Sequence, residues 1–440
     1  MYDAPTLRTF DRAGAAIISG IVLLSFVSAN DARGAGFFLQ EQSAIASGRA
    51  FAGGAAAAGD ASTIFYNPAG MTELHGIQGE ASIYVIAPQA HVVDRGSSVT
   101  VGPGPATPAG GAREDQAFNP QAMGSVFLAA PAGDDLWLGL GVTVPFGLRD
   151  HYQLNYFGRY DSTKTELQTI DVAPSVAYAI TRRFSIGAGV DIQRADAKLQ
   201  NALPNPFTPG GPNPATDGLL DAAGGDWSLG FNAGILLKPV DDLRLGLSYR
   251  SEIDHDLKGR ATTQIPGLLA SSQGVTGSFS LPDILAIGVA YDVLPSVTVL
   301  GQANYYGWRR FKEVRLTFAD GTQQIIPQNY RNSVGFSVGA EWRVTESWTL
   351  RSGVEWDQTP TPSDNRSTSV PDSDRTWLAF GLSYEFSERI GIDFSYAHDF
   401  SNSAPINRTT NFSSLLTTAN TRGRTTDSSD VVGLSMRVRY

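Results

Sequence analysis

Most of this chain, from Gly76 to its last residue, repeats one pattern in which apolar residues alternate with small or polar ones. In the segment 136–144, Leu and Val residues alternate with Trp, Gly and Thr. The same period of two recurs in segments 184–193, 243–250, 378–386 and 390–397. A period of two places each apolar set on one face of a β-strand. The chain is therefore predicted to be all-β.

The connections between these segments decide the kind of β-protein. The pattern predicts about fourteen strands, near residues 76–92, 120–131, 135–148, 165–180, 183–200, 226–239, 243–258, 276–292, 296–308, 330–344, 347–358, 375–386, 390–399 and 429–440. Tight turns occupy alternate connections, at 131–134, 181–182, 239–242, 294–295, 345–346 and 387–389. The other connections are long: 93–119, 149–164, 201–225, 259–275, 309–329, 359–374 and 400–428. A soluble sandwich could alternate its side chains, but strict short–long alternation of connections is typical of an antiparallel transmembrane β-barrel.

Composition agrees with a barrel and excludes other classes. Only 17% of the 440 residues are charged, yet no internal apolar run is long enough for a transmembrane helix. The net charge of −10 argues against a nucleic-acid partner. Because the chain has no cysteine, disulfides and thiolate metal sites are excluded.

Enzymatic chemistry finds no support in the sequence. The five His residues are scattered and have no metal-ligand spacing. No nucleophile motif and no phosphate-binding loop occurs. The acids of segment 359–374 could bind a cation, although a solvated loop explains them as well. We therefore expect neither an enzyme, nor a cofactor, nor a metal site.

The N-terminal part of the chain divides into a leader and a segment without strand pattern. Residues 1–34 combine weak basic character with an apolar stretch at 13–27 and small residues, which indicates a signal peptide cleaved before Ala35. A short anchor helix is the alternative. Residues 35–75 are rich in Gly and Ala, so they could pack closely inside the lumen as a hatch. The barrel would then comprise residues 76–440.

The last strand, 429–440, is amphipathic and ends on Tyr440. A terminal strand of this kind resembles the signal that the outer-membrane assembly machinery reads, and an ordinary edge strand is the alternative. In a barrel its free edge would be closed by the first strand. The expected location is the bacterial outer membrane, with outer-membrane lipid and lipopolysaccharide around the barrel.

Several short motifs share their order and spacing with one known family. The motifs are Ala35-Gly36-Phe37, Gly48-Arg49-Ala50, Asn67-Pro68-Ala69, Pro145-Phe146-Gly147-Leu148, residues 227–236 (WSLGFNAGIL), residues 248–252 (SYRSE), Leu281-Pro282-Asp283 and residues 357–377. From Ala35 to Tyr440 the chain resembles the FadL family of outer-membrane long-chain fatty-acid transporters, whose relatives pass aromatic hydrocarbons. The resemblance implies a fourteen-stranded barrel blocked by an N-terminal hatch.

The resemblance also implies a path for a hydrophobic ligand. Capture would occur in a groove between the third and fourth extracellular loops, here 201–225 and 259–275. The ligand would pass to a deeper pocket near the hatch and leave sideways through a kink in the third strand. Pro145 lacks an N–H and Gly147 relaxes the backbone, so a kink there is also expected from the residues themselves. Alternatively, Pro145 simply ends the strand.

Candidate ligand-binding and gating residues follow from this path. The hatch supplies Phe37, Phe38 and Leu39, together with Asn67, Pro68 and Ala69, and the kink supplies Pro145, Phe146 and Gly147. The two loops supply Leu203, Phe207, Leu219, Leu220, Leu268 and Leu269, which could also pack only against neighbouring loops. A carboxylate needs a cation or hydrogen-bond donor, and the candidates are Lys198, Arg250, Arg315 and Arg351. Such Arg residues could instead pair with inward acids such as Glu355 or Glu385.

The predicted function is uptake of long-chain fatty acids by passive, ligand-gated diffusion with lateral exit. Transport of aromatic hydrocarbons is the first alternative. A surface adhesion or receptor barrel without transport is the second. A general porin is disfavoured, because a hydrophilic pore gains nothing from an apolar plug.

Overall fold

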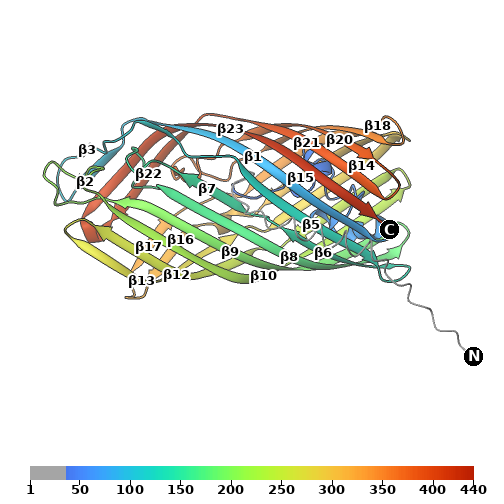
Figure 1. Ribbon diagram of the computed structural model, residues 1–440, viewed down its shortest axis with the longest axis horizontal. Helices are drawn as coiled ribbons and strands as arrows, with labels where there is room; N and C mark the ends of the chain where they lie inside the picture. Colours follow the sequence, from blue (N-terminus) through green and yellow to red (C-terminus); the bar gives the residue numbers. More distant parts are fainter. Residues whose placement is uncertain (1–35) are drawn as a thin grey trace, which may run out of the picture.

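The computed structural model describes residues 36–440, and the predicted leader, residues 1–34, lies outside this range. The strands form one sheet that closes into a 14-stranded antiparallel barrel (Figure 1). Closure is made by β23 (Thr417–Arg439), which pairs with β1 (Gln78–Asp94) on one side and with β21 (Ile390–Ser401) on the other. The predicted fold class is confirmed.

Of the fourteen spans of the barrel, nine are single uninterrupted strands, and each of the other five is broken into two successive strands. The continuous spans are β1, β5 (Gln121–Pro131), β8 (Lys164–Thr181), β9 (Phe184–Leu203), β10 (Gly218–Val240), β18 (Ser333–Arg343), β19 (Trp348–Asp357), β20 (Arg375–Glu385) and β23. The interrupted spans are β6 (Leu136–Thr143) with β7 (Gly147–His151), β11 (Leu243–Arg250) with β12 (Ile253–Ile265), β13 (Leu269–Leu281) with β14 (Ile284–Leu294), β15 (Val297–Tyr306) with β16 (Glu313–Phe318), and β21 with β22 (Ala404–Phe412). Short strands β2 (Ser98–Val101), β3 (Thr107–Pro108), β4 (Glu114–Gln116) and β17 (Gln323–Pro327) lie among the long connections.

The outward face of the barrel is apolar and the inward face is polar. On β9, Ile186 and Val190 are 40% and 47% exposed, whereas Asp191 and Gln193 are fully buried. This distribution is the reverse of a soluble protein and suits a wall between lipid and a packed lumen. Within residues 36–440, no helix is long and apolar enough to cross a membrane.

Three of the expected long loops are shorter than the sequence pattern indicated. Strand β9 continues to Leu203 and β10 already begins at Gly218, and only residues 266–268 connect β12 to β13. Strand β23 begins at Thr417, inside the expected loop 400–428. Beyond the bilayer both faces of a strand meet water or other loops, so the apolar alternation fades while the backbone pairing continues.

Two neighbouring spans that were expected to be continuous strands are each broken, and the two breaks lie opposite each other in the sheet. The seventh span is interrupted at Ser251-Glu252 and the eighth at Pro282-Asp283. Pro282 has no N–H to donate to a ladder, which accounts for the second break. The backbone N–H of Ser251 still donates to the carbonyl oxygen of Phe231 at 2.8 Å.

Residues 36–74 lie inside the barrel, nearer the end that carries the C-terminus (Figure 1). This segment contains α2 (Ala44–Ser47), α3 (Thr63–Tyr66) and the 3₁₀-helix η2 (Pro68–Glu73). The backbone of the segment touches the wall where the wall has glycine. A Cβ on Gly187 would lie 2.4 Å from the Ala69 nitrogen, and one on Gly234 would lie 1.9 Å from Asn67 Oδ1. Wall glycines therefore make room for the segment.

Candidate functional site

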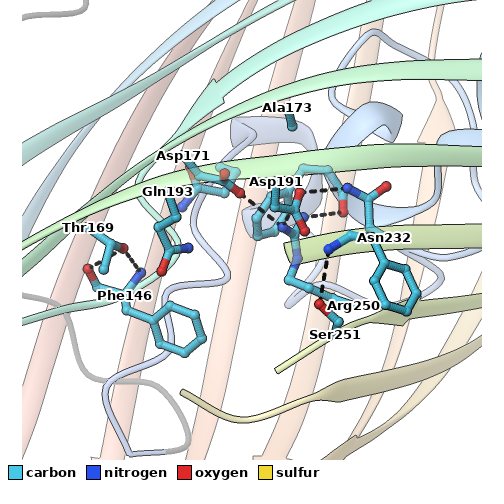
Figure 2. Close-up of polar contacts among 12 residues, drawn as sticks. Phe146, Thr169, Asp171, Ala173, Asp191, Gln193, Asn232, Arg250 and Ser251 are labelled. Atoms are coloured by element: carbon cyan, nitrogen blue, oxygen red, sulfur yellow. Dashed lines mark hydrogen bonds and ion pairs between the residues drawn. The ribbon is translucent and has the colours of Figure 1, made fainter. Parts of the chain in front are cut away.

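The third span of the barrel is interrupted between Thr143 and Gly147, where β6 ends and β7 begins. The neighbouring strand β8 bridges part of this gap through Thr169. The Phe146 N–H donates to Thr169 Oγ1 at 2.9 Å, and the Thr169 N–H donates to the Phe146 carbonyl oxygen at 3.0 Å (Figure 2). A side-chain hydroxyl thus replaces one bond of the regular ladder.

The start of the luminal segment supplies the remaining partners for the gap. Residues 37–39 run antiparallel to residues 145–147, with Phe38 and Phe146 facing each other in an isolated β-bridge. The Leu39 N–H donates to the Pro145 carbonyl oxygen at 2.8 Å, and the Gly147 N–H donates to the Phe37 carbonyl oxygen at 3.1 Å. The luminal segment therefore acts as a short strand against the kink.

Gln42 completes this pairing with its side chain. Its Nε2 donates to the Val144 carbonyl oxygen at 2.9 Å, and its Oε1 accepts from the Val144 N–H at 3.3 Å. Together with Thr169 and residues 37–39, Gln42 satisfies the backbone polar groups of residues 144–146. An unsatisfied backbone group would be costly in this buried place. The luminal segment and the kinked wall form one hydrogen-bonded unit.

An aromatic cluster surrounds the inner face of the gap. The Phe37 ring lies 4.6 Å from Trp308 and 5.3 Å from Phe311 between centroids, both in edge-to-face geometry. The Phe38 ring lies 5.4 Å from Phe146. The 3₁₀-helix η3 (Trp308–Arg310), where the ninth span turns inward, brings Trp308 into this cluster. Edge-to-face aromatic pairs add to the stabilisation from apolar burial.

A mainly apolar cavity of about 130 Å³ borders this cluster. Phe37, whose carbonyl oxygen accepts from Gly147 at the kink, also lines the cavity, and so does Leu148 on β7. Further apolar walls come from Leu167, Leu199, Leu257, Val275, Phe279, Phe311 and Leu316.

Several polar and charged groups, Glu166 and Lys198 among them, contribute to the cavity wall. Arg408 on β22 is 4% exposed, and its Nε lies 3.5 Å from Asp161 Oδ1. Gln328 is also buried there, and its Oε1 has no hydrogen-bond partner within residues 36–440. Side chains of Thr165, Ser367 and Ser369 add hydroxyl groups. The cavity thus combines apolar walls with a guanidinium group.

Of the predicted cations, Arg250 is the most deeply placed. It pairs with Asp171 at 3.0 Å and with Asp191 at 2.8 Å, and Asn232 donates to Asp191 at 2.7 Å (Figure 2). Its guanidinium group lies 4.8 Å from the Phe65 ring centroid. Arg250 therefore joins three strands to the luminal segment and does not line the cavity.

The other predicted cations lie at the wall. Lys198 pairs with Asp221 at 3.3 Å. By its position it belongs with the outward-facing residues of β9, such as Ile186 and Val190. It nevertheless contributes to the cavity lining. Arg315 on β16 pairs with Glu313 and donates to Gln323, on the face opposite Leu316. Arg351 on β19 donates to Ser383 and pairs with Glu341 at 3.5 Å.

The predicted apolar loop residues separate into two groups and one isolated side chain. Leu203 and Leu220 are buried with Ala261 and Ile265 in one core cluster. Leu219, Leu268 and Leu269 line a shallow depression at the β12–β13 turn. Phe207 is 75% exposed in the connection between β9 and β10.

The connection between β9 and β10 is held down at its far end. Arg159 donates through Nε to Asp217 at 2.8 Å, and Tyr160 donates to the same carboxylate at 2.7 Å. Burial raises the pKa of the Asp217 carboxyl, against the opposing effect of these two donors. Arg159 also donates to the carbonyl oxygen of Ala109 at 2.8 Å, so one side chain joins three long connections.

Asn67, Pro68 and Ala69 fix the luminal segment to the wall. Asn67 Nδ2 donates to the carbonyl oxygens of Ala55 at 2.6 Å and Ile235 at 3.0 Å. Its Oδ1 accepts from the Ala69 N–H at 3.1 Å and so caps η2, which begins with Pro68. One amide therefore joins two parts of the segment to β10.

Sequence reasoning missed Gln42, Thr169, Trp308, Asp161 and Arg408. Arg408 could have been found from the sequence, because Ala404, Ile406 and Arg408 are spaced two residues apart and share the buried face of β22. The expected loop 400–428 hid this alternation. Gln42 and Thr169 gave no comparable signal, since a polar residue in the hatch or on an inward strand face is ordinary.

These features define the class of protein. The chain is a membrane-spanning β-barrel with an obstructed lumen, an internal apolar cavity and an interrupted strand beside it. Residues 25–440 match the family model described as outer membrane protein transport protein (OMPP1/FadL/TodX), and the chain belongs to this family. Its location is the outer membrane.

Relatives and solved structures agree with this assignment. The chain is 29% identical over 399 residues to a long-chain fatty acid transport protein of Escherichia coli O6:H1, covering 83% of this chain and 87% of the relative. It is 29% identical over 410 residues to outer membrane protein P1 of Haemophilus influenzae, covering 84% and 87%. The crystal structure of a Pseudomonas aeruginosa FadL homologue matches with a TM-score of 0.84 and 26% identity, covering 92% and 100%. The Ralstonia pickettii toluene transporter TbuX, at 20% identity, a TM-score of 0.62 and coverage of 86% and 94%, shares the fold.

Proposed function

We propose that this protein is a channel for the uptake of long-chain fatty acids by passive, ligand-gated diffusion. The observation that carries the proposal is the apolar cavity, which has Arg408 on its wall and reaches the kinked strand at Leu148 and the luminal segment at Phe37. The fatty-acid relatives named above support the same substrate class. A fatty acid would place part of its alkyl chain among the apolar walls and its carboxylate beside Arg408.

The energetics favour such a ligand over a water-soluble one. Each methylene that leaves water contributes about 0.8 kcal/mol. Charge-assisted hydrogen bonds between guanidinium and carboxylate are among the strongest in proteins. The Oε1 of Gln328, which has no hydrogen-bond partner in the described part of the chain, can accept a hydrogen bond from a protonated acid or a bridging water. An aromatic hydrocarbon could use the apolar walls but has no group for Arg408, so it remains the second candidate.

We propose lateral exit through the kink in the third strand. The alternative route, through the end that carries the C-terminus, leads past a polar chamber lined by Arg49, Arg244, Glu341, Arg351, Glu385 and Arg437. Many of these side chains are ion-paired, for example Arg244 with Asp292 at 2.7 Å and Arg437 with Asp393 at 2.7 Å. An alkyl chain gains nothing in such a chamber, whereas the kink is lined by Phe37, Phe38 and Phe146.

In this proposal the luminal segment is the hatch of the channel. Residues 35–75 would gate the barrel of residues 76–440, after removal of the leader 1–34. Asn67, Pro68 and Ala69 anchor the hatch to β10, and residues 37–42 are the part whose displacement opens the kink. Partners of the barrel would be outer-membrane lipid, lipopolysaccharide and, through β23, the assembly machinery. Members of this family are transport channels, and we propose no catalytic role.

Uptake of radiolabelled oleate by a deletion strain tests the proposal. Restoration of uptake by the wild-type gene is expected, and Arg408→Gln should reduce it. Arg260→Gln is a matched control, because Arg260 is exposed on β12 and does not line the cavity. If the deletion leaves oleate and toluene uptake unchanged but removes a surface-binding phenotype, the barrel is an adhesion or receptor scaffold. If only toluene uptake is lost, the aromatic alternative holds.

A further inference from the structure

The connection between β19 and β20 folds inward over the cavity. Within it, Ser367, Ser369 and Val370 line the cavity, and Thr368 is fully buried. We call residues 367–370 the roof segment. Since the connection belongs to the long-loop end of the barrel, the roof segment is a part of the cavity wall that comes from the extracellular side.

One carboxylate holds the roof segment in place. Asp161 Oδ2 accepts hydrogen bonds from the Thr368 N–H at 2.6 Å and from Thr368 Oγ1 at 2.9 Å. The other oxygen of Asp161 lies 3.5 Å from Arg408 Nε. Asp161 thus ties three elements together: the connection after β7, the roof segment and β22.

Two tyrosines of the same connection add secondary contacts to the roof segment. Tyr152 donates to the Thr368 carbonyl oxygen at 2.8 Å, and Tyr156 donates to Thr368 Oγ1 at 2.9 Å. Their rings stack with centroids 4.3 Å apart. Thr368 thus makes four hydrogen bonds to the connection after β7: two to Asp161, one to Tyr152 and one to Tyr156. Breaking these bonds would free the roof segment from that connection.

Asp161 and Arg408 both line the cavity. The carboxylate of Asp161 therefore occupies the position beside Arg408 that a ligand carboxylate would take. Two carboxylates at one guanidinium group repel each other unless one of them is protonated or moves away. A ligand carboxylate and the latched Asp161 are thus competitors for Arg408.

We propose that Asp161 is an internal carboxylate latch, which a ligand carboxylate displaces from Arg408. The roof segment opens transiently, and a fatty acid that pairs with Arg408 keeps Asp161 away and Thr368 released. A ligand shifts a conformational equilibrium only by its differential affinity for the two states. An uncharged hydrocarbon does not compete with Asp161 for Arg408, so its affinity for the closed and the open state is the same at this position. The opening of the roof segment therefore selects for ligands with a carboxylate. This inference rests on the proposed transport of fatty acids.

The absence of cysteine from the chain allows a clean test. Ser369→Cys places one thiol in the roof segment of the full protein, reconstituted in nanodiscs. The readouts are the rate of labelling by a water-soluble maleimide and, separately, the affinity for each probe. The probes are palmitate and hexadecanol, which share one alkyl chain. Palmitate should accelerate labelling at least tenfold, and hexadecanol should leave the rate unchanged.

Variants locate the effect at the latch. Asp161→Ala should label rapidly without ligand, and palmitate should add no further increase. Thr368→Val keeps the charge of Asp161 but loses the hydroxyl contacts, so it should show an intermediate rate. Asp364→Ala removes an exposed acid of the same connection and should behave like the parent.

The outcomes separate the latch from the transport proposal. If palmitate binds in an Arg408-dependent manner while the labelling rate stays constant, the latch is refuted and fatty-acid binding stands. If hexadecanol accelerates labelling as much as palmitate does, the carboxylate selection is refuted. If palmitate does not bind at all, the proposed function itself fails.

Discussion

The substitution Gln42→Leu probes the joint between hatch and wall. Leucine has a similar size but cannot replace the bonds that the Gln42 amide makes to the N–H and the carbonyl oxygen of Val144. Each backbone group left buried without a partner costs roughly 1–3 kcal/mol. The lower bound for the two groups, about 2 kcal/mol, shifts the equilibrium between seated and displaced hatch by roughly 30-fold.

Labelling of a single thiol at Leu39→Cys measures this shift. Leu39 is almost fully buried against the kink, so its thiol reacts only when the hatch leaves the wall. The Gln42→Leu background should raise the maleimide rate by roughly 30-fold. Gln302→Leu is the matched control, because Gln302 bonds the hatch at Ala55, far along the segment. Equal rates in the parent and the Gln42→Leu protein would refute the idea that Gln42 closes the gap.

Three further predictions concern binding, hatch seating and stability. Arg408→Gln should weaken palmitate binding about tenfold, the loss of roughly 1.4 kcal/mol of charge-assisted bonding, and leave hexadecanol affinity unchanged in a titration of purified protein. Gly187→Val should raise the labelling of the same Leu39→Cys thiol, because its Cβ would lie 2.4 Å from the Ala69 nitrogen. Arg250→Met should lower the free energy of unfolding by about 3–5 kcal/mol in urea, since it leaves Asp171 and Asp191 buried without their cation. Lys198→Met, whose ion pair is one-third exposed on both sides, should cost under about 1 kcal/mol in the same assay.

The barrel could be predicted from the sequence because its signals are local. Period-two alternation and alternating turns follow from strand geometry, and they located the ends of the spans at the short turns within a few residues. The kink was also predictable, because Pro145 removes a donor whatever its surroundings. The start of β10, the β12–β13 turn and the start of β23 were predicted less well, since strands that leave the bilayer lose the apolar face on which the pattern depends.

The cavity required contacts between residues far apart in the chain. Arg408 meets Asp161 across 247 positions of sequence, and Gln42 meets Val144 across 102. Neither pair has a spacing that a sequence motif could reveal. The predicted cation Arg250 shows the converse case, in which an inward Arg is matched by the acids Asp171 and Asp191. Only the folded geometry distinguishes a cation that lines a cavity from one that is fully paired.

Lateral exit through the hatch-covered kink is the central claim, and a reversible lock tests it most directly. Phe38 and Phe146 face each other in the bridge between hatch and kink. Opposed residues in such a pair lie roughly 4.5–5.5 Å apart between Cα atoms, within the range of a disulfide. The double variant Phe38→Cys/Phe146→Cys would therefore lock the hatch to the wall when oxidised.

The measurement is oleate uptake by cells that carry this double variant, before and after reduction with dithiothreitol. The reduced protein is its own control, because both substitutions remain present. We expect uptake to stop under oxidation and to return on reduction. Unchanged uptake by the fully oxidised protein would contradict exit through the kink.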